Sequence, residues 1–548
     1  MLCRQMQYRS ESSVKSYFNP SIGYNGQFTS TLVSAATMPA LRYFLPAAAL
    51  VVIAFAVRLA CGWEPVFPVD DAYITAHNAQ VLHWGHDPNF VGTPALAGAT
   101  SPFHLALVAL LMYFVSPLWA IDFTAWLGVL LFALGIARLA WSQGVPPAAS
   151  ALLVVAGLLA ARTPHQLMNG LETGWAIAAV TWVLALESSK RRSETFAFSA
   201  LCGMLPMLRP ELVALSLLLL PMPALRVWQQ ARNTRASLVL LGKCALTALV
   251  AMSPWLVWQF AATGHLVPAT IAAKRYFFAE SAVSADIKWL WVKGSTIYFL
   301  CSCGPLAFAC LALPFTRIGK AALLFTAVFL AAYYMLFPGA LCHAQGRYLY
   351  ILLPFLLFGA ASLFRLLSDR PAPRRWATIY VMAAAVQAAL LAPFTWREHQ
   401  AEQINTRREL VGVADWCNAH IPAGSRLLIH DAGYISYATS FHMVDIVGLK
   451  SPENIDLHRT LTYESGGASR AAAVNEAAIR ANADYFIVLD LWDGLYKLTD
   501  GLRQYGWTLE PVRTTGTYRV YRMSRGPCLM SGGREVRMSL GGGPVVGG

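Results

Sequence analysis

Charged residues are scarce in this sequence. They make up 13% of its 548 residues, whereas a soluble globular protein has about 25%. The shortage is concentrated between residues 42 and 396, where apolar runs reach or approach the ~17–25 residues that cross a bilayer as a helix; examples are 43–61, 236–260, 321–337 and 349–364. The alternation typical of membrane β-barrel strands is missing. The sequence therefore predicts an all-α polytopic membrane bundle with about 11 transmembrane helices.

Cysteine pairs with the spacing of metal ligands are also missing. The ten cysteines are scattered, and several lie inside apolar runs. Cys301 and Cys303 are too close in sequence to form a zinc-binding pair. We interpret the cysteines as packing residues and predict no cofactor, although a divalent metal bound by other residues stays open.

The charges that are present give a net charge of +13, and many of them lie in short loops between apolar runs. Basic clusters occur at 190–192, 226–235, 317–320 and 365–375. This pattern is typical of the positive-inside rule, so these loops are predicted to be cytoplasmic and nucleic acid is not a predicted partner. The intervening stretches then face outward; they are 62–101, the region around 209–211, 263–288 and 338–347.

Four apolar segments lie between the first outer loop and the basic cluster at 190–192, namely 102–117, 120–141, 147–161 and 171–187. An even number of crossings would put that cluster outside. One segment is therefore predicted to be re-entrant or to continue its neighbour.

Composition divides the chain into four parts. Residues 1–41 are a polar tail without a signal-peptide cleavage site, predicted to be cytoplasmic, and Met38 is an alternative start. Residues 42–396 are the transmembrane domain. Residues 397–525 have ordinary soluble polarity, with predicted strands at 427–430, 485–489 and 518–521 and a helix at 407–418, so they form an extracytoplasmic α/β domain. The Gly-rich residues 526–548 are predicted to be disordered.

Two adjacent carboxylates, Asp70 and Asp71, follow Pro68 in the first outer loop. A proline followed by acidic residues is a signal for the start of a helix, and His77 is seven residues beyond Asp70 on the same helical face. Mutual repulsion and partial burial raise the pKa of at least one of the two, which suits a general base. The alternative interpretation is a helix-capping pair in a solvated loop.

The order of several motifs resembles the GT-C superfamily of membrane glycosyltransferases, closest to bacterial arabinofuranosyltransferase-like and mannosyltransferase-like members. Residues 70–74 (Asp-Asp-Ala-Tyr-Ile) and 100–102 (Thr-Ser-Pro) are similar to its first outer loop. Further similar segments follow in the same order over roughly residues 45–450; they are 169–173, 208–211, 264–274, 346–349, 431–433 and 444–449. Ala269 stands where the family has asparagine, and His86-Asp87 replaces its usual turn.

The resemblance implies a transmembrane catalytic domain and inverting transfer of a sugar from a polyprenyl-phosphate donor to a hydroxyl of a cell-envelope acceptor. It places the reaction at the outer face of a bacterial inner membrane. Asp70 and Asp71 are the candidate catalytic residues, one of them as the base. The candidates for binding the donor phosphate are outer-side groups near span ends, where a charge is costly unless it is used: Lys274, Arg275, Arg347 and Tyr348. Headgroup contact by snorkelling is the alternative role for each cation.

A second set of residues is predicted to contact the substrate or to support the site. It consists of Tyr73, His77, Glu172, Arg209 and Glu211. Because buried charges are normally paired, we expect Arg209 to pair with Glu172 or Glu211 and to hold the wall of the site.

Two other functions remain open alternatives. One is a protein O-mannosyltransferase, and the other is a transporter or flippase of lipid-linked sugars. A transporter would be expected to show internal repeats and charged groups at the bilayer midplane, whereas this acidic pair lies in a loop. The outer α/β domain is predicted to bind or orient the acceptor, because it lacks a phosphate loop, a nucleophile elbow and metal-ligand spacing.

Overall fold

A computed structural model describes residues 28–189, 191–367 and 371–525. The chain divides into two units, 1–42 and 43–548, and the fold and the site described below lie in the second. Most of the predicted polar tail (1–27), the Gly-rich end (526–548), Lys190 and residues 368–370 lie outside the described residues.

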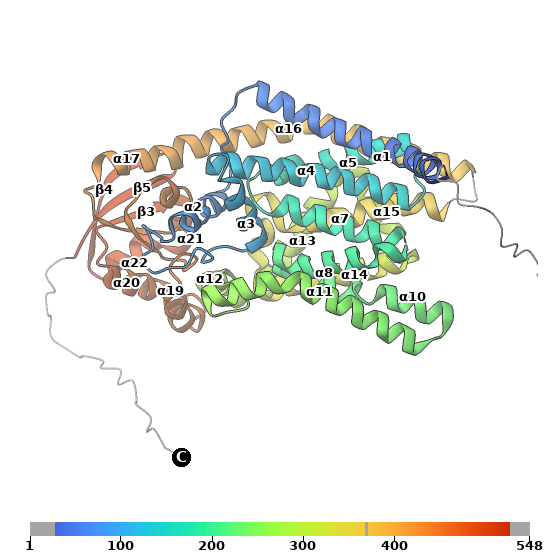
Figure 1. Ribbon diagram of the computed structural model, residues 1–548. Coiled ribbons are helices and arrows are strands. Elements are labelled where there is room, and N and C mark those ends of the chain that lie inside the picture. The colour runs from blue at the N-terminus through green and yellow to red at the C-terminus, as the bar shows by residue number, and fades with distance from the viewer. Residues whose placement is uncertain (1–27, 190, 368–370, 526–548) are drawn as a thin grey trace, which may run out of the picture. The chain divides into compact units, whose positions relative to one another are not determined.

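Helices account for nearly all of the membrane part (Figure 1). They are α1 (Phe28–Ala60), α2 (Asp71–Trp84), α3 (Pro102–Leu111), α4 (Pro117–Ser142), α5 (Pro147–Leu159), α6 (Thr163–Leu167), α7 (Thr173–Ser189), α8 (Thr195–Leu208), α9 (Val213–Leu219), α10 (Met222–Ala231), α11 (Thr234–Thr263), α12 (Ala269–Phe278), α13 (Ala285–Cys303), α14 (Arg317–Leu336), α15 (Leu353–Leu366) and α16 (Pro371–Thr406). Tighter 3-10 segments at Gly304–Phe315 and Pro338–Leu352 extend α13 and precede α15.

Eight helical segments of the described chain are long and apolar enough to cross a membrane. Three shorter apolar helices accompany them, α3, α5 and α8. Helix α3 has ten residues and is therefore ~15 Å long, about half of the hydrocarbon thickness. We infer that α3 is the segment that does not cross. The total of about 11 spans stays a prediction.

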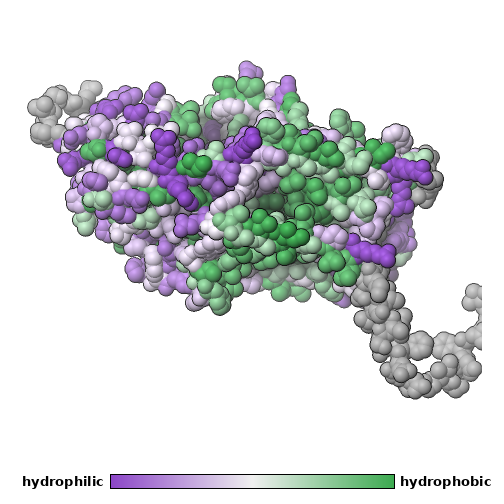
Figure 2. Space-filling model, turned by 90° about the horizontal axis from the view of Figure 1, so that it is seen from above, coloured by the Kyte–Doolittle hydropathy of each residue, from purple (hydrophilic) through white to green (hydrophobic). Residues whose placement is uncertain are grey.

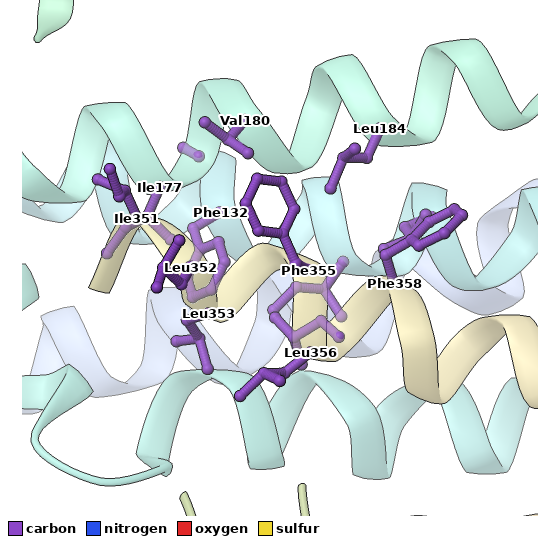
Figure 3. Close-up of a cluster of buried hydrophobic side chains, with 14 of the residues drawn as sticks. Phe132, Ile177, Val180, Leu184, Ile351, Leu352, Leu353, Phe355, Leu356 and Phe358 are labelled. Carbon is purple, nitrogen blue, oxygen red and sulfur yellow. The ribbon is translucent and has the colours of Figure 1, made fainter. Parts of the chain in front are cut away.

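The centre of the bundle is a dry core between α4, α7 and α15 (Figure 3). Phe132 of α4 and Val180 of α7 lie against Phe355 of α15, and all three are fully or almost fully buried. Small residues allow other helices to approach closely: a Cβ on Gly203 of α8 would lie 2.1 Å from the Ala248 carbonyl oxygen of α11. This rigid bundle is the base on which the loops predicted to face outward are held.

The C-terminal part contains one five-stranded sheet in the order β2-β1-β3-β5-β4. The strands are β1 (Arg426–Ile429), β2 (His442–Asp445), β3 (Tyr485–Leu489), β4 (Trp507–Thr515) and β5 (Tyr518–Arg525). Strand β1 is parallel to β2 and β3, and β5 is antiparallel to β3 and β4. The predicted fold class, a helical membrane bundle followed by an α/β region, is confirmed.

Alternate residues of the strands supply two separate cores, one on each face of the sheet. Leu428 and Phe486 pack with α20 (Arg470–Ala481) and α22 (Leu498–Gln504), whereas Leu427 and Ile487 pack with α17 (Gly412–His420) and α18 (Tyr434–Ala438). Helix α16 runs through a π-turn at Arg407–Val411 into α17, so the helix continues across the predicted domain border at 396/397. Figure 2 shows hydrophobic residues gathered over the bundle and hydrophilic ones over the end with the sheet.

Candidate functional site

The acidic pair lies at the start of α2, as the sequence predicts, but Asp70 does not act as a simple cap of that helix. Its Oδ2 accepts a hydrogen bond from the backbone N–H of Gly433 (2.8 Å), and its Oδ1 accepts one from Tyr434 (2.8 Å). Asp70 therefore binds the first turn of α18 in the C-terminal domain. A Cβ on Gly433 would lie 2.1 Å from the Asp70 carbonyl oxygen, so only glycine permits this approach.

Asp71 points to a different set of partners, at the end of the helical bundle. Its Oδ2 accepts a hydrogen bond from Arg347 Nη2 (2.8 Å) and lies 3.6 Å from Lys274 Nζ. The Arg347 side chain is 7% exposed, whereas those of Asp71 and Lys274 are 30% and 27% exposed. Asp71 and Lys274 thus present an open ion pair, and Arg347 supports it from within.

The two carboxylates differ in their electrostatics. Burial raises the pKa of Asp70 well above its usual range, and the charges of Asp431 and Asp71 raise it further, despite the two backbone hydrogen bonds. Burial also acts to raise the pKa of Asp71, but Lys274 and Arg347 outweigh it and hold that pKa well below its usual range. The expected shift of one carboxyl is therefore present, and it falls on Asp70.

Behind this ion pair lies a buried wall of two guanidinium groups around one tyrosine ring. The guanidinium carbons of Arg209 and Arg347 lie 4.7 and 4.9 Å from the centroid of Tyr348, and Arg347 Nη2 donates to the Tyr348 hydroxyl (2.9 Å). Arg209 donates to Glu211 (2.8 Å) and lies 3.7 Å from Glu172. The predicted pairing of Arg209 is present with both glutamates.

Breaks in the helices place these side chains. Arg209 lies between α8 and the turn at Pro210–Leu212. Arg347 follows a reversal in which Ala344, Gln345 and Gly346 all have positive φ. Non-helical backbone at this depth is tolerated where it borders protein or a polar cavity. The reversal turns Arg347 toward Asp71, 276 residues earlier in the chain.

The C-terminal domain supplies a third carboxylate, Asp431, which directly follows β1 and His430. Its Oδ2 accepts a hydrogen bond from the Tyr518 hydroxyl and lies 3.1 Å from His430 Nε2. Asp431 contributes to the raised pKa of Asp70. The sequence contains the Asp431-Ala432-Gly433 motif but predicts no role for Asp431 in the site; the signal available for that role is its place at the end of a predicted strand.

Three predicted site residues have their partners outside the cluster of Asp71, Lys274 and Arg347. His77 is fully buried, its Nε2 lies 3.0 Å from Asn89 Oδ1, and burial lowers its pKa to about 4. Tyr73 is also fully buried, and its ring contacts that of Tyr434 edge-on at 4.8 Å. Arg275 donates to the Tyr463 hydroxyl (3.0 Å) and covers its ring. All three hold the loops and the C-terminal domain together.

A buried ion pair completes this contact between domains. Lys450 Nζ donates to Asp87 Oδ2 (2.9 Å) and to Asn78 Oδ1 (2.6 Å), and both charged side chains are 0% exposed. The His86-Asp87 departure in the sequence thus has a structural explanation, because Asp87 is the counter-ion of Lys450. The sequence offered no signal for this partner.

No cluster of three or more His, Cys, Asp or Glu side chains that could hold a metal occurs within 28–189, 191–367 and 371–525. The charged groups of the site neutralise one another: Lys274 is the partly exposed cation beside Asp71, and Arg347 is the buried one. Such an arrangement can bind an anion by exchange with Asp71.

A helical membrane bundle followed by a C-terminal α/β region matches the GT-C fold of the structures to which the chain is similar. The chain is similar to the structure of ArnT from Cupriavidus metallidurans bound to undecaprenyl phosphate, with a TM-score of 0.51, 13% identity, and coverage of 90% of this chain and 98% of that chain. At this identity the likeness is one of fold.

Two further structures are similar with lower scores. Arabinofuranosyltransferase AftD from Mycobacteria gives a TM-score of 0.48 at 15% identity, covering 88% of this chain and 41% of that chain. The Archaeoglobus fulgidus oligosaccharyltransferase gives 0.44 at 12%, covering 84% and 69%. Residues 395–523 match a domain of unknown function (DUF8728). The sequence has no match among curated proteins.

Proposed function

We propose that the protein transfers a sugar from a polyprenyl-phosphate donor to a hydroxyl group of a cell-envelope acceptor, at the outer face of a bacterial inner membrane. The observation that carries the proposal is the division of labour between the adjacent carboxylates. Asp71 contacts the cations Arg347 and Lys274 at the end of the bundle, whereas Asp70 faces the C-terminal domain. A leaving phosphate and an entering hydroxyl need places of this kind on opposite sides of the sugar.

The donor phosphate would bind at Lys274 and Arg347. Lys274 is in α12, and Arg347 is in the 3-10 segment that precedes α15. Both lie at one end of the bundle, so a lipid tail can remain in the bilayer while its phosphate reaches them. The similar ArnT structure contains undecaprenyl phosphate, which is a ligand of this chemistry. Arginine can bind two phosphate oxygens at once, and lysine adds a point charge.

Phosphate binding would also change the role of Asp71. In the structure Asp71 neutralises both cations. A phosphate that takes over these contacts releases the carboxylate, which can then orient a sugar hydroxyl. The two cations are already in position before the donor binds. They therefore stabilise the charge that develops on the phosphate without a reorganisation of solvent, which is how preorganised groups contribute to electrostatic catalysis.

Asp70 is the proposed general base. Its raised pKa gives it more basicity than an ordinary aspartate, and its two backbone hydrogen bonds fix its direction. The acceptor oxygen attacks the anomeric carbon, its proton passes to Asp70, and the bond from the anomeric carbon to the phosphate oxygen breaks with its electron pair on the phosphate. Attack from the face opposite the phosphate inverts the configuration.

The C-terminal domain is proposed to orient the acceptor, with Trp492 as the contact. Trp492, at the start of the domain's helix α21 (Asp490–Tyr496), lies 6.1 Å from the His343 ring and 6.2 Å from the His430 ring, and it is partly exposed. The Trp492 ring stacks on those of Phe278 and Tyr496, with centroids 5.5 Å apart in both cases, so its exposed edge is the part that would contact a sugar ring. Trp492→Leu should raise the acceptor KM with the donor KM unchanged; Trp416→Leu, on α17 and stacked on His420, is the matched control. Equal KM values in both variants would refute this role.

A transporter or flippase is less well supported, because the charged groups gather at one end of the bundle. Protein O-mannosyl transfer differs from the proposed reaction only in its acceptor and its sugar, so the assay described next distinguishes the two.

In this assay, membranes containing the full chain are supplied with a panel of polyprenyl-phosphate sugars and envelope acceptors. We expect transfer that falls at least ~100-fold in Asp70→Asn, the lower end for loss of a general base.

Asp286→Asn, an exposed carboxylate in the first turn of α13, is the control and should retain full activity. Equal activity of Asp70→Asn and the native chain would exclude Asp70 as the base. Turnover of a nucleotide sugar without any lipid donor would exclude the proposed reaction itself.

A further inference from the structure

A cavity of about 890 Å³ lies between α1, α4, α5 and α16. Its inner wall is apolar and includes Leu50, Ala54, Val129, Val155 and Leu158. Figure 2 looks onto the face that carries α1 and α16 and shows a hollow with hydrophobic surroundings there. The volume lies in the range of ligand pockets, ~300–1,000 Å³.

The cavity extends from the bilayer interior to one membrane surface. Its lining follows α1 from Leu50 and continues past the end of the helix to Gly62. From Leu50 to the last helical residue, Ala60, α1 rises about 15 Å, which is close to one leaflet, ~15 Å of hydrocarbon. The chain continues from Gly62 directly to Asp70, so the mouth of the cavity is on the same membrane side as the acidic pair.

Polar groups are concentrated toward this mouth. Arg58, Glu64 and Arg407 line it, together with the indole rings of Trp63 and Trp396, whose centroids are 5.7 Å apart. Paired tryptophans are typical of the bilayer interface. The mouth thus offers two cations, one carboxylate and an aromatic pair at the depth of lipid head groups.

Two residues of the lining have a buried polar atom without a hydrogen bond to a described residue. Asp122 is 3% exposed and His165 is also 3% exposed. Asp122 Oδ2 lies 3.9 Å from Arg58 Nη2 but has no hydrogen bond to a described residue, and the same holds for His165 Nε2. Buried polar atoms normally have partners, so a polar group of the occupant or water is expected beside them.

A wall separates this cavity from the proposed active site. Phe67 lines the cavity, and its ring lies 5.9 Å from that of Tyr73, behind the acidic pair. Among the described lining residues, neither Asp71 nor Lys274 nor Arg347 occurs.

We propose that this cavity binds a phospholipid of the outer leaflet. Acyl chains lie against the apolar wall, the phosphate lies at Arg58 and Arg407, and the hydroxyl or ammonium group of the head meets Glu64 or Asp122. A polyprenyl phosphate shares the phosphate and the apolar tail, so the experiment must separate these two sources. The inference does not rest on the proposed glycosyl transfer, and its readout requires no turnover.

The test uses the full chain in nanodiscs that contain a diazirine-labelled phosphatidylethanolamine, followed by identification of the cross-linked peptides. We expect cross-links on α1 within residues 50–62 and on α16 around 395–404. Ala54→Trp, which fills the cavity, should reduce them at least fivefold. Ile53→Trp adds the same ring on the exposed side of α1 (Ile53 is 63% exposed) and should leave them unchanged.

Arg58→Gln combined with Arg407→Gln should also reduce cross-linking at least fivefold, which keeps the test valid if Ala54→Trp does not fold. An excess of undecaprenyl phosphate should leave the cross-links in place. Equal labelling of Ala54→Trp and Ile53→Trp, or of the double arginine variant and the native chain, would overturn the proposal. Displacement of the label by undecaprenyl phosphate would overturn the phospholipid assignment and make the cavity a polyprenyl site.

Discussion

At the scale of single residues, the site depends on two neighbouring aspartates with opposite pKa shifts. Sequence reasoning identifies the pair from Pro68 and the resemblance of residues 70–74, and it predicts that one pKa rises. It does not identify which one, because the deciding partners are remote. Gly433 lies 363 residues from Asp70, and Arg347 lies 276 residues from Asp71.

The raised pKa of Asp70 predicts a specific pH dependence. A base acts only when it is ionised, so kcat/KM should fall as the pH decreases through the Asp70 pKa, above the ~3.9 of an ordinary aspartate. Asp431 raises this pKa; the acidic limb in Asp431→Asn should therefore move to lower pH. Asp415→Asn on α17 should leave the limb in place. A limb at the same pH in all three proteins would contradict this assignment.

The same shift has a consequence for stability. Because the pKa of Asp70 is higher in the folded state than in the unfolded state, folding favours its protonated form. The resulting stabilisation is complete below ~3.9, the unfolded-state pKa, and is lost as the pH rises through the folded-state pKa. Thermal unfolding of Asp70→Asn, which is neutral throughout, should depend less on pH over this range than that of the native protein.

At the scale of elements, local patterns predict regular segments well and irregular ones poorly. Strand β3 was predicted with its observed bounds, and β1 and β5 were found within a few residues. Strand β2 begins with His442 and ends with Asp445, and β4 contains Pro511 next to a register shift, so neither has a continuous apolar strand pattern. The reversal at 343–346 follows from contacts with Asp71 and Gln166 rather than from local preference.

Helix α18 provides a test of how one element positions the base. Gly433→Ala introduces a methyl group 2.1 Å from the Asp70 carbonyl oxygen and 2.5 Å from Asp70 Oδ2. The C-terminal domain must then move, and transfer should fall at least ~10-fold, because small displacements of a catalytic group are costly. The assay is initial-rate transfer in membranes.

Gly494→Ala, in α21 and with open space around its Cβ position, is the matched control and should retain the native rate. Normal transfer by Gly433→Ala at normal expression would show that this approach does not position the base.

At the scale of the whole molecule, the topology assigned from basic loops anticipates the site. Four stretches predicted to face outward supply Asp71, Arg209, Lys274 and Arg347, and the structure brings these residues into one cluster. The pattern of basic loops indicates which loops share a side of the membrane. It contains no information on the distances between side chains, so it could not predict that Arg275 and His77 lie outside the cluster.

The contact between the bundle and the C-terminal domain should depend on the buried Lys450–Asp87 pair. Lys450→Met leaves Asp87 buried without its counter-ion, which costs about 3–5 kcal/mol. Thermal unfolding in nanodiscs should show a clearly lower midpoint. Combining Lys450→Met with Asp87→Asn removes both charges, keeps an oxygen that accepts the backbone hydrogen bonds of Asn89 and Phe90, and should restore much of the loss. A midpoint unchanged in the single variant would show that the pair does not stabilise the contact.

The central claim is that Lys274 and Arg347 hold a lipid-borne phosphate beside a separate base, Asp70. The most direct test is the Kd of undecaprenyl phosphate for the full chain in nanodiscs, measured for the native protein, Asp70→Asn and the Lys274→Gln/Arg347→Gln double variant. We predict native affinity without turnover for Asp70→Asn, and affinity at least ~10-fold weaker for the double variant, since each lost charged hydrogen bond costs about 1.5–3 kcal/mol. Equal Kd values for all three proteins would contradict the account.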